Sequence, residues 1–406
     1  MASNPPIVPR GGKAGLDGAT ARIQRNRRSE FAIWWREIDR TLLFLVLTLM
    51  ALGTAAVAAS SPASARRLST ASVRLDDLHF FVMHIRYQLI GLVAMFAASM
   101  LPKDMARRAG VLLCFAMLGA LMLVPLIGFS VNGAKRWLNL GMSLQPSEFL
   151  KPAFAIGMAW ILSWRVRDPN LPVIELTTGL MGMIAVLLMA QPDFGSAILF
   201  IGVWFVMVLM SGISLKRIGL AGGAGLGFVV LAYMFYDNAR HRIDSFLGGG
   251  TAFDQVDLAQ RTLLAGGWTG SGLWLGTRKL GLPEAHTDYI FSVIGEEFGL
   301  IACAVIIVLY LALVLRVLVR LLDEEDLFTT LAAAGLVAQI GGQAFINILV
   351  NLQLFPSKGM TLPLISYGGS STIALCLGIG FLLSITRRNP FIKRERFSLS
   401  SMGFKS

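Results

Sequence analysis

Residues 283–297, PEAHTDYIFSVIGEE, hold an unusual density of side chains that can exchange protons. In order, the acids and the histidine are Glu284, His286, Asp288, Glu296 and Glu297. The whole chain has only 24 acidic residues and 4 histidines among 406. A carboxylate beside a reacting hydroxyl can act as a general base, and polar neighbours can orient it. This stretch is therefore the first candidate for a catalytic centre.

Basic side chains in a second segment suit an anionic ligand. The loop NGAKRWLNLGMSLQPSEFLKP, residues 132–152, places Lys135 and Arg136 beside a tryptophan, with Glu148 farther on. Two interpretations are open. The bases and the tryptophan can form an aromatic belt with snorkelling cations at a membrane surface. Alternatively, two adjacent bases can clamp the phosphate of a lipid-linked substrate.

Three shorter segments add candidates. RHRIDSF contains Arg242, which belongs either to a solvated loop or to an anion site, and FPSKGMTLPLISYGGSS contains Lys358 and Ser366. The prolines and glycines of the latter segment predict non-helical backbone, which at membrane depth must be buried in protein or line a cavity. We therefore expect this segment to line a cavity, with Lys358 and Ser366 facing its polar interior. In QPDFGSA, an aspartate after proline favours a helix N-cap role for Asp193.

The elements that must position these residues are membrane helices. The chain is 55% hydrophobic and 15% charged, well below the usual charged fraction of about 25%. The uncharged run TLLFLVLTLMALGTAAVAAS is long enough to cross a hydrocarbon core of about 30 Å. We predict an all-α polytopic membrane protein with about ten spans, at 41–60, 79–100, 109–129, 147–164, 173–190, 195–211, 218–236, 289–315, 327–350 and 368–386.

The distribution of basic residues predicts which loops face outside. With ten spans, 23 of the 36 lysines and arginines fall on the side of the two termini, and 12 on the opposite side. The positive-inside rule then places both termini in the cytoplasm. The net charge of +12 thus reflects topology and attraction to anionic lipids rather than nucleic-acid binding. We divide the chain into a basic tail at 1–40, a membrane domain at 41–386 with a large, ordered outside loop at 237–288, and a basic tail at 387–406.

The acids of the opening stretch then separate into two groups. Glu284, His286 and Asp288 lie at the outside mouth of the eighth span. Glu296 and Glu297 are expected inside the hydrocarbon, where ionisable residues are costly and face a partner or a cavity. Their predicted role is structural, through hydrogen bonds to other helices, although a proton relay is also open.

The motifs resemble those of the SEDS family, the polytopic peptidoglycan polymerases of bacteria, and within it the cell-division branch of the alphaproteobacterial type. The resemblance runs from the first span to the tenth. The matching elements are G-A-x-R-W at 133–137, Q-P-S-E at 145–148, Q-P-D-x-G at 191–195, P-E-A-H-T-D at 283–288, G-E-E-x-G at 295–299 and K-G-x-T-L-P-L-I-S-Y-G-G-S-S at 358–371. In the long loop, Gln260 follows an alanine where many members have a tyrosine.

The resemblance implies polymerisation of lipid II, an undecaprenyl-pyrophosphoryl disaccharide-pentapeptide, at the bacterial inner membrane. The key aspartate of the family corresponds to Asp288, which we assign as general base. Arg136, Lys358 and Arg242 are candidates for binding pyrophosphate, with Lys135, Gln260 and Ser366 as further substrate-binding candidates, and His286 and Glu284 would orient or tune. No motif fixes a metal site, although a divalent ion such as Mg²⁺ or Mn²⁺ could supplement the cations.

Several alternatives stay open at this level. A ten-span protein with a polar cavity could instead flip lipid II, or act as a non-catalytic scaffold of the division machinery. A role in elongation rather than division is a further alternative within the family. The partners that the resemblance implies are a class B penicillin-binding protein, which is the septal transpeptidase, other division proteins and membrane lipids.

Overall fold

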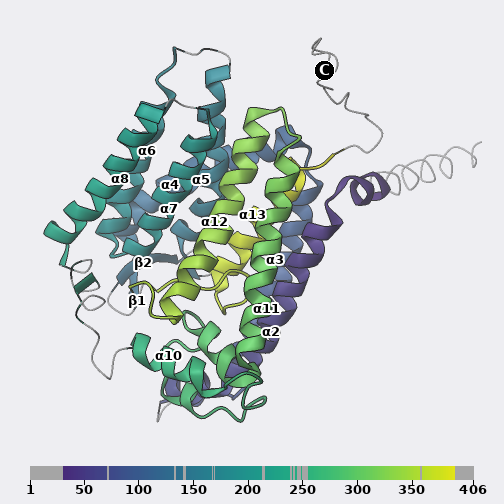
Figure 1. The fold of residues 1–406 in the computed structure, drawn as a ribbon, viewed down its shortest axis with the longest axis vertical. Coiled ribbons are helices and arrows are strands. Elements are labelled where there is room, and N and C mark those ends of the chain that lie inside the picture. The colour runs from purple at the N-terminus through teal and green to yellow at the C-terminus, as the bar shows by residue number, and fades with distance from the viewer. Residues whose placement is uncertain are drawn as a thin grey trace, which may run out of the picture. The chain divides into compact units, whose positions relative to one another are not determined.

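Figure 1 shows the fold in a computed structural model. The structure describes residues 31–70, 73–131, 134–139, 143–166, 168, 170–212, 215–237, 240, 243–244, 248, 255–356 and 359–388. The chain divides into two compact units, one made of Met1–Asp39 with Arg387–Ser406 and the other of Arg40–Thr386. In the described part of the first unit, the Arg387 guanidinium forms an ion pair of 2.8 Å with Glu37.

The second unit is built mainly from helices, and each of the ten predicted stretches coincides with one. These helices are α2 (Arg40–Leu68), α3 (His79–Met100), α4 (Lys103–Ile127), α5 (Pro146–Ser163), α6 (Val173–Ala190), α7 (Phe194–Met210), α8 (Leu215–Phe235), α11 (Ile290–Leu321), α12 (Leu327–Asn351) and α13 (Gly369–Ile385). Shorter elements are β1 (Phe129–Val131), β2 (Ala134–Asn139), β3 (Ser143–Leu144), η1 (Trp164–Val166), α10 (Gln255–Ala265) and η2 (Arg278–Gly281). The strands form a small antiparallel sheet in the order β1-β2-β3.

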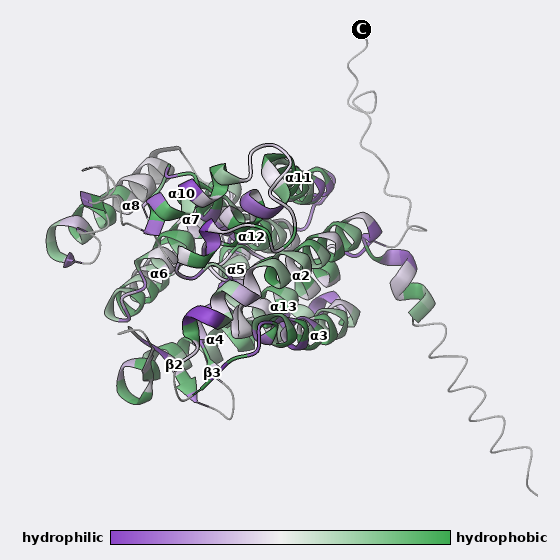
Figure 2. Cartoon of the chain, turned by 90° about the horizontal axis from the view of Figure 1, so that it is seen from below, coloured by the Kyte–Doolittle hydropathy of each residue, from purple (hydrophilic) through white to green (hydrophobic). Residues whose placement is uncertain are grey.

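Six of these helices, α2, α3, α4, α6, α11 and α12, are long and apolar enough to cross a membrane. The helices are coloured mostly as hydrophobic, in green, in Figure 2. Leucines, valines and phenylalanines stay exposed on α3, α4 and α11, as expected where lipid replaces water. The chain is therefore a multi-pass membrane protein.

Helix α5 lies inside the bundle and packs against α4, α12, α13 and α7 (Figure 1). Small residues along it, including Ala153, Ala155 and Ala159, are fully buried. Small side chains let helix backbones approach closely where no hydrophobic effect drives association. This packing brings the outer ends of α5, α7, α12 and α13 toward one region.

Helix α11 is two helices that meet at Gly299, whose backbone is non-helical with φ 82° and ψ 172°. This region of φ and ψ is open almost only to glycine. Because the chain turns there, the Cys303 thiol lies 3.8 Å from the Phe291 carbonyl, although twelve helical residues would separate them by about 18 Å. The 22 residues after Gly299 suffice to cross the membrane, since they rise about 33 Å.

Candidate active site

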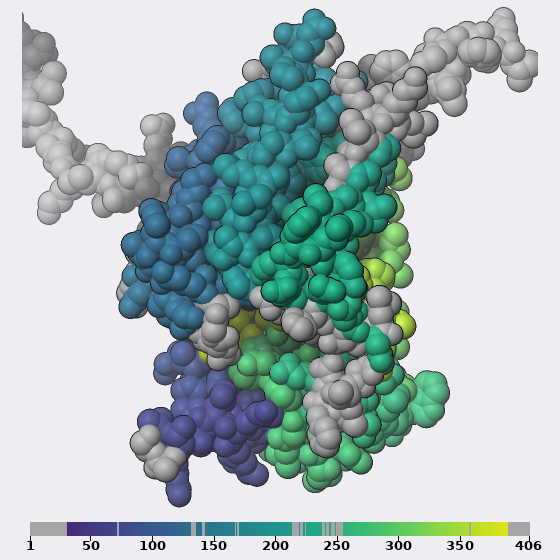
Figure 3. Space-filling view, turned by 90° about the vertical axis from the view of Figure 1, so that its left-hand side faces the viewer, coloured from purple at the N-terminus to yellow at the C-terminus, as the bar shows by residue number. Residues whose placement is uncertain are grey.

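A cavity of about 470 Å³ lies among the ends of several helices and the segments between them. Five separate parts of the chain line it, with these residues: Arg136, Trp137, Gln145, Glu148, Asp193, Ser196, Gln255, Glu284, Thr287, Asp288, Gly359, Met360, Thr361, Tyr367, Gly368, Gly369, Ser370 and Ser371. In the space-filling view of Figure 3, the yellow C-terminal part of the chain is visible in a recess between the teal helices and the green segments.

Asp288 is held through its backbone by α12. The Asn347 side-chain amide donates to the Asp288 carbonyl at 2.8 Å, and Asn351 donates to the same oxygen at 3.2 Å. Asn347 also donates to the Met360 carbonyl at 2.6 Å. One buried amide thus joins the Asp288 segment to the segment before α13, and both line the cavity.

The segment before α13 is fixed on the other side by a buried hydroxyl. Ser366 Oγ donates to the Thr287 carbonyl at 2.6 Å and accepts from the Leu362 amide at 2.8 Å. The Tyr367 amide donates to the His286 carbonyl at 2.9 Å. The Ser366 side chain therefore binds backbone on both sides and is not among the residues that line the cavity. The structure thus gives it a structural contact in place of the predicted contact with substrate.

Glu284 lines the cavity and is exposed. Its φ of 52° is in the left-handed region, which costs a non-glycine residue of order 1–3 kcal/mol. A local turn offsets this strain: the Thr287 hydroxyl donates to the Glu284 carboxylate at 2.8 Å, and the Thr287 and Tyr289 amides donate to the Glu284 carbonyl. Glu284 thereby shapes the turn that leads to Asp288.

His286 lies in an aromatic cluster behind the cavity rather than in it. Its ring centroid is 4.2 Å from that of Phe80 and 5.3 Å from that of Tyr367. Burial lowers the His286 pKa from 6.5 to about 4, because the charged ring would lose its hydration. Among the described residues, its Nδ1 has no hydrogen-bond partner. The imidazole is therefore neutral at physiological pH, and its ring packs near Tyr367, which lines the cavity.

The two adjacent bases of the 132–152 loop point to different places. Arg136 lines the cavity and uses its guanidinium to bind the carbonyls of Gln191, at 2.9 Å, and Pro192. Lys135 instead donates to the carbonyls of Pro125 and Leu126, at 2.8 and 3.2 Å. These carbonyls belong to the last turn of α4, where a cation is favoured by the helix dipole. Arg136 thus lies at the cavity with its guanidinium held by two carbonyls, whereas Lys135 binds the end of α4.

The segment around Gln191 supports Arg136. Pro125 inside α4 has no N–H, so it leaves the Leu121 carbonyl without its helical partner. The Gln191 side-chain amide donates to this carbonyl at 3.1 Å. Asp193 then caps α7 by accepting from the Ser196 amide at 3.2 Å. The QPD element is therefore anchored on both sides of its turn.

Glu148 lines the cavity and forms an ion pair of 2.7 Å with the buried Lys151, three residues later on α5. The pair neutralises a carboxylate that would otherwise repel an anionic substrate. Gln260 lies on α10, outside the residues that line the cavity, whereas Gln255 at the start of the same helix lines it. Arg242 and Lys358 lie outside the described residues.

Glu296 and Glu297 contact loop backbone rather than other helices. Glu296 accepts from the Arg278 and Lys279 amides, at 2.6 and 2.9 Å. Glu297 accepts from the Trp274 and Gly276 amides and pairs with the Lys279 ammonium. Both acids precede the break at Gly299, and the helix after the break is long enough to cross a membrane without them. The expectation of acids hydrogen-bonded to helices within the hydrocarbon is thus replaced by acids that bind a loop.

No group of three or more metal-ligating side chains occurs in the part of the chain that the structure describes. Of the carboxylates at the cavity, Glu148 is paired with Lys151, Asp193 caps a helix and Glu284 accepts from the Thr287 hydroxyl, and Asp288 lines the same space. Mg²⁺ is often bound by one or two carboxylates together with substrate phosphates. The donor set therefore fits an ion held mainly by a substrate.

The arrangement combines a carboxylate, Asp288, with a cation, Arg136, at one open cavity. Such a site can take a proton from a hydroxyl while it stabilises a departing anion. Five parts of the chain line it, so the chemistry depends on how the segments before α5, α11 and α13 and the first turns of α7 and α10 are assembled.

Comparison with known proteins shows the family of the chain. Residues 40–390 match the family model FtsW/RodA/SpoVE, described as a cell cycle protein. The chain belongs to this family. It is 36% identical over 375 residues to the probable peptidoglycan glycosyltransferase FtsW of Caulobacter vibrioides, which covers 92% of this chain and 95% of that protein. It is 34% identical over 385 residues to the protein of the same name in Xanthomonas oryzae pv. oryzae, covering 90% and 76%.

Solved structures of SEDS proteins share the fold. A chain of a peptidoglycan synthase complex, described as coordinating polymerization and crosslinking, superposes with a TM-score of 0.71 at 27% identity, covering 86% of this chain and 97% of that one. The rod shape determining protein RodA of Thermus thermophilus superposes with a TM-score of 0.64 at 26% identity, covering 87% and 97%.

Sequence reasoning missed the residues that hold Asp288 in place. Asn347 and Asn351 are one helical turn apart, and Gln343, one turn earlier, donates to the Thr361 carbonyl at 2.9 Å. All three lie on one face of α12. Three amides at i, i+4 and i+8 inside an apolar span were the signal that could have revealed them.

Proposed function

We propose that the chain is a peptidoglycan glycosyltransferase that polymerises lipid II into β-1,4 glycan strands. The observation that carries the proposal is the placement of the Asp288 carboxylate and the Arg136 guanidinium at one cavity of about 470 Å³, lined by five parts of the chain. The names of the FtsW relatives support the reaction class. The cavity is larger than any single side chain requires and is lined by polar groups, which suits a sugar.

In the proposed reaction, the 4-hydroxyl of one saccharide attacks the anomeric carbon of another. The new bond joins that oxygen to C1, and the bond between C1 and the lipid pyrophosphate oxygen breaks. Asp288 takes the hydroxyl proton, and the bonding pair leaves with the pyrophosphate. Because an α-linked donor gives a β-linked product, the displacement inverts, which one base accomplishes without a second carboxylate as nucleophile.

Cations would stabilise the pyrophosphate as it departs. Arg136 is the described candidate, and Lys358 and Arg242 are further candidates by sequence. A divalent ion, Mg²⁺ or Mn²⁺, would add positive charge at the same place if Asp288 or Glu284 and the substrate phosphates held it. Glu284 sets the turn before Asp288, and His286 supports Tyr367 from behind.

We also propose the location and the partners. The positive-inside distribution of the basic residues supports a cavity that opens on the periplasmic face of the inner membrane. The similarity to the FtsW proteins supports a role at the division septum. The similarity to a chain of a synthase complex that couples polymerization and crosslinking supports a class B penicillin-binding protein as partner.

The test is polymerisation of purified lipid II by the Asp288→Asn variant, with and without the transpeptidase and Mg²⁺. We expect loss of glycan product with an unchanged melting temperature. Asp257→Asn is the matched control: Asp257 lies on α10, pairs with Arg261 at 2.8 Å and is outside the cavity lining, so its polymerisation should stay near the wild-type level.

Three outcomes would contradict the proposal. Polymer from Asp288→Asn at the wild-type rate would exclude the assigned base. Lipid II translocation by the wild type in vesicles, without polymer under any condition, would favour a flippase. Polymer that depends on the transpeptidase preparation alone would favour a scaffold. Depletion in cells distinguishes division from elongation, because loss of septal synthesis leaves filaments whereas loss of elongation leaves rounded cells.

A further inference from the structure

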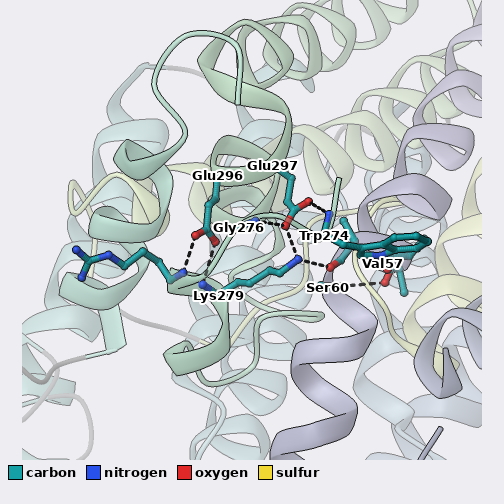
Figure 4. A network of polar contacts seen from close by, with 10 residues as sticks. Val57, Ser60, Trp274, Gly276, Lys279, Glu296 and Glu297 are labelled. Carbon is teal, nitrogen blue, oxygen red and sulfur yellow. Dashed lines mark hydrogen bonds and ion pairs between the residues drawn. The ribbon is translucent and has the colours of Figure 1, made fainter. Parts of the chain in front are cut away.

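We propose that Trp274, Lys279, Glu296 and Glu297 form a positioning device that fixes Asp288 by anchoring the loop before it to two breaks in membrane helices. The inference rests on the proposed function of Asp288. Figure 4 shows the group, with the two glutamates above Lys279 and Trp274 beside α2. None of the four side chains lines the cavity. We call residues 266–281 the bridging loop.

The bridging loop repairs the break in α11. The helix segment before Gly299 leaves carbonyls without partners, and the Ser271 and Gly272 amides donate to those of Glu296 and Glu297, at 2.8 and 3.0 Å. The segment after Gly299 leaves amides without partners, and two of them, those of residues 300 and 301, donate to loop carbonyls at 3.0 and 3.2 Å. Both kinds of orphan group at a helix end are thus satisfied by one loop.

The loop also repairs a break in α2. Pro62 lies inside α2 and has no N–H, so the carbonyl of Ala58 has no partner in its own helix. The Trp274 indole N–H donates to this carbonyl at 3.0 Å. At the next residue, the Lys279 ammonium donates to the Ala59 carbonyl at 2.9 Å. The proline therefore creates the acceptor that receives the loop.

Lys279 connects the two repairs. It is 3% exposed and binds both the Ala59 carbonyl of α2 and the Glu297 carboxylate of α11. Glu296, 1% exposed, accepts the backbone amides of Arg278 and Lys279 at the start of η2. An unpaired charge at such a site would be strongly destabilising. The pair therefore specifies one position for η2 relative to both helices.

The consequence reaches Asp288 because the chain between the anchors is short. Six residues, 282–287, separate the end of η2 from Asp288. The bridging loop fixes the first end of this segment, and the amides of Asn347 and Asn351 fix its last residue. A short segment held at both ends has little conformational freedom. The Asp288 carboxylate is therefore already in position before a substrate binds.

A double-mutant cycle tests the Pro62 acceptor. Trp274→Phe keeps an aromatic side chain and removes the indole N–H. We expect about a fivefold lower kcat for lipid II polymerisation with KM unchanged, because one lost neutral hydrogen bond corresponds to about that factor. Pro62→Ala restores a helical N–H to the Ala58 carbonyl. In that background, Trp274→Phe should change kcat less than twofold. An equal loss in both backgrounds would overturn the assignment of the acceptor.

The buried ion pair offers an independent arm. Lys279→Met leaves Glu297 charged and unpaired, whereas Lys279→Met with Glu297→Gln removes both charges. We expect the double variant to recover at least tenfold in kcat over Lys279→Met, since removing both partners avoids an uncompensated buried charge. If Lys279→Met does not fold, the double-mutant cycle of Trp274→Phe and Pro62→Ala tests the inference by itself. A double variant no better than the single one would contradict the pairing.

Hydrogen exchange separates this inference from the proposed function. Amides of residues 282–289 should exchange at least fivefold faster in Trp274→Phe than in wild type, with the exchange of α5 unchanged as a reference. Faster exchange supports the anchor even if the protein makes no polymer. Unchanged exchange together with unchanged kcat, in a protein whose Asp288→Asn variant is inactive, would overturn the inference and leave the proposed function standing.

Discussion

Asn347→Leu tests how far the proposed catalysis depends on α12. The substitution keeps approximately the volume of the side chain and removes its N–H donors. Two carbonyls lose a bond, that of Asp288 at 2.8 Å and that of Met360 at 2.6 Å. The Asp288 carbonyl keeps the longer bond from Asn351, at 3.2 Å, whereas the structure gives the Met360 carbonyl no comparable substitute among its described contacts.

The expected size follows from these contacts. Each lost neutral hydrogen bond contributes about 1 kcal/mol, and a buried carbonyl left without a partner costs about 1–3 kcal/mol. Asn347 is 2% exposed, so water does not readily replace it. We therefore expect a loss of about 2–4 kcal/mol in the free energy of unfolding. A displacement of Asp288 by about 1 Å would add a loss in kcat of up to about a hundredfold.

The assay measures polymerisation of lipid II and the melting temperature on the same detergent preparations. Gln343→Leu is the matched control, because it lies one turn earlier on the same face and binds the Thr361 carbonyl rather than Asp288. Both variants should lose stability, but kcat should fall at least tenfold further in Asn347→Leu. Equal losses of kcat in the two variants would refute the idea that α12 sets the place of Asp288.

Two further predictions follow from buried groups near the site. His286→Phe keeps an aromatic ring at this position and removes a titrating group whose pKa is lowered from 6.5 to about 4. Because His286 takes up its proton at a higher pH in the unfolded chain than in the folded one, the stability of the wild type should fall by at most about 3 kcal/mol as the pH drops from 6.5 to 4. Thermal melts at each pH should show a weaker pH dependence of stability for the variant. An unchanged slope would exclude His286 as its source. Gly299→Ala places a Cβ against the Trp268 carbonyl at a backbone φ of 82°, whereas the Cβ of Gly281→Ala meets open space. Gly299→Ala should therefore lower the melting temperature sharply, and Gly281→Ala should not. Equal melting temperatures for the two variants would exclude a backbone break at Gly299.

The helices could be predicted from sequence because apolar runs of membrane length have few alternatives. All ten expected stretches contain a helix, and the α3 and α6 boundaries coincide with the prediction. The placement of Asp288 and Arg136 at one cavity could be anticipated only in part, because it depends on which outer segments meet. A charge count assigns loops to a face of the membrane but does not say how they pack.

Several side chains bind backbone instead of the partners predicted for them. Ser366 and Lys135 were predicted to bind substrate, yet they donate to the carbonyls of Thr287 and Pro125. Glu296 and Glu297 were predicted to be structural, and their contacts agree with that role, but they bind amides within residues 274–279 instead of the transmembrane helices. In a water-soluble protein, solvent would bind the free backbone groups at turns. A charged or hydroxyl side chain is then more readily interpreted as a ligand-binding group. In a membrane protein the freed backbone at breaks and turns competes for the same side chains.

Proline in these helices also determines when each helix can complete its hydrogen bonds during synthesis. Pro62 leaves the Ala58 carbonyl of α2 without its helical hydrogen bond, and the donor that completes it, Trp274, is 216 residues after Ala58. Pro125 leaves α4 in the same state until Gln191 has been synthesised, 70 residues after Leu121. Each early helix therefore enters the membrane with an unmet carbonyl, and its maturation waits for a later segment to emerge from the ribosome.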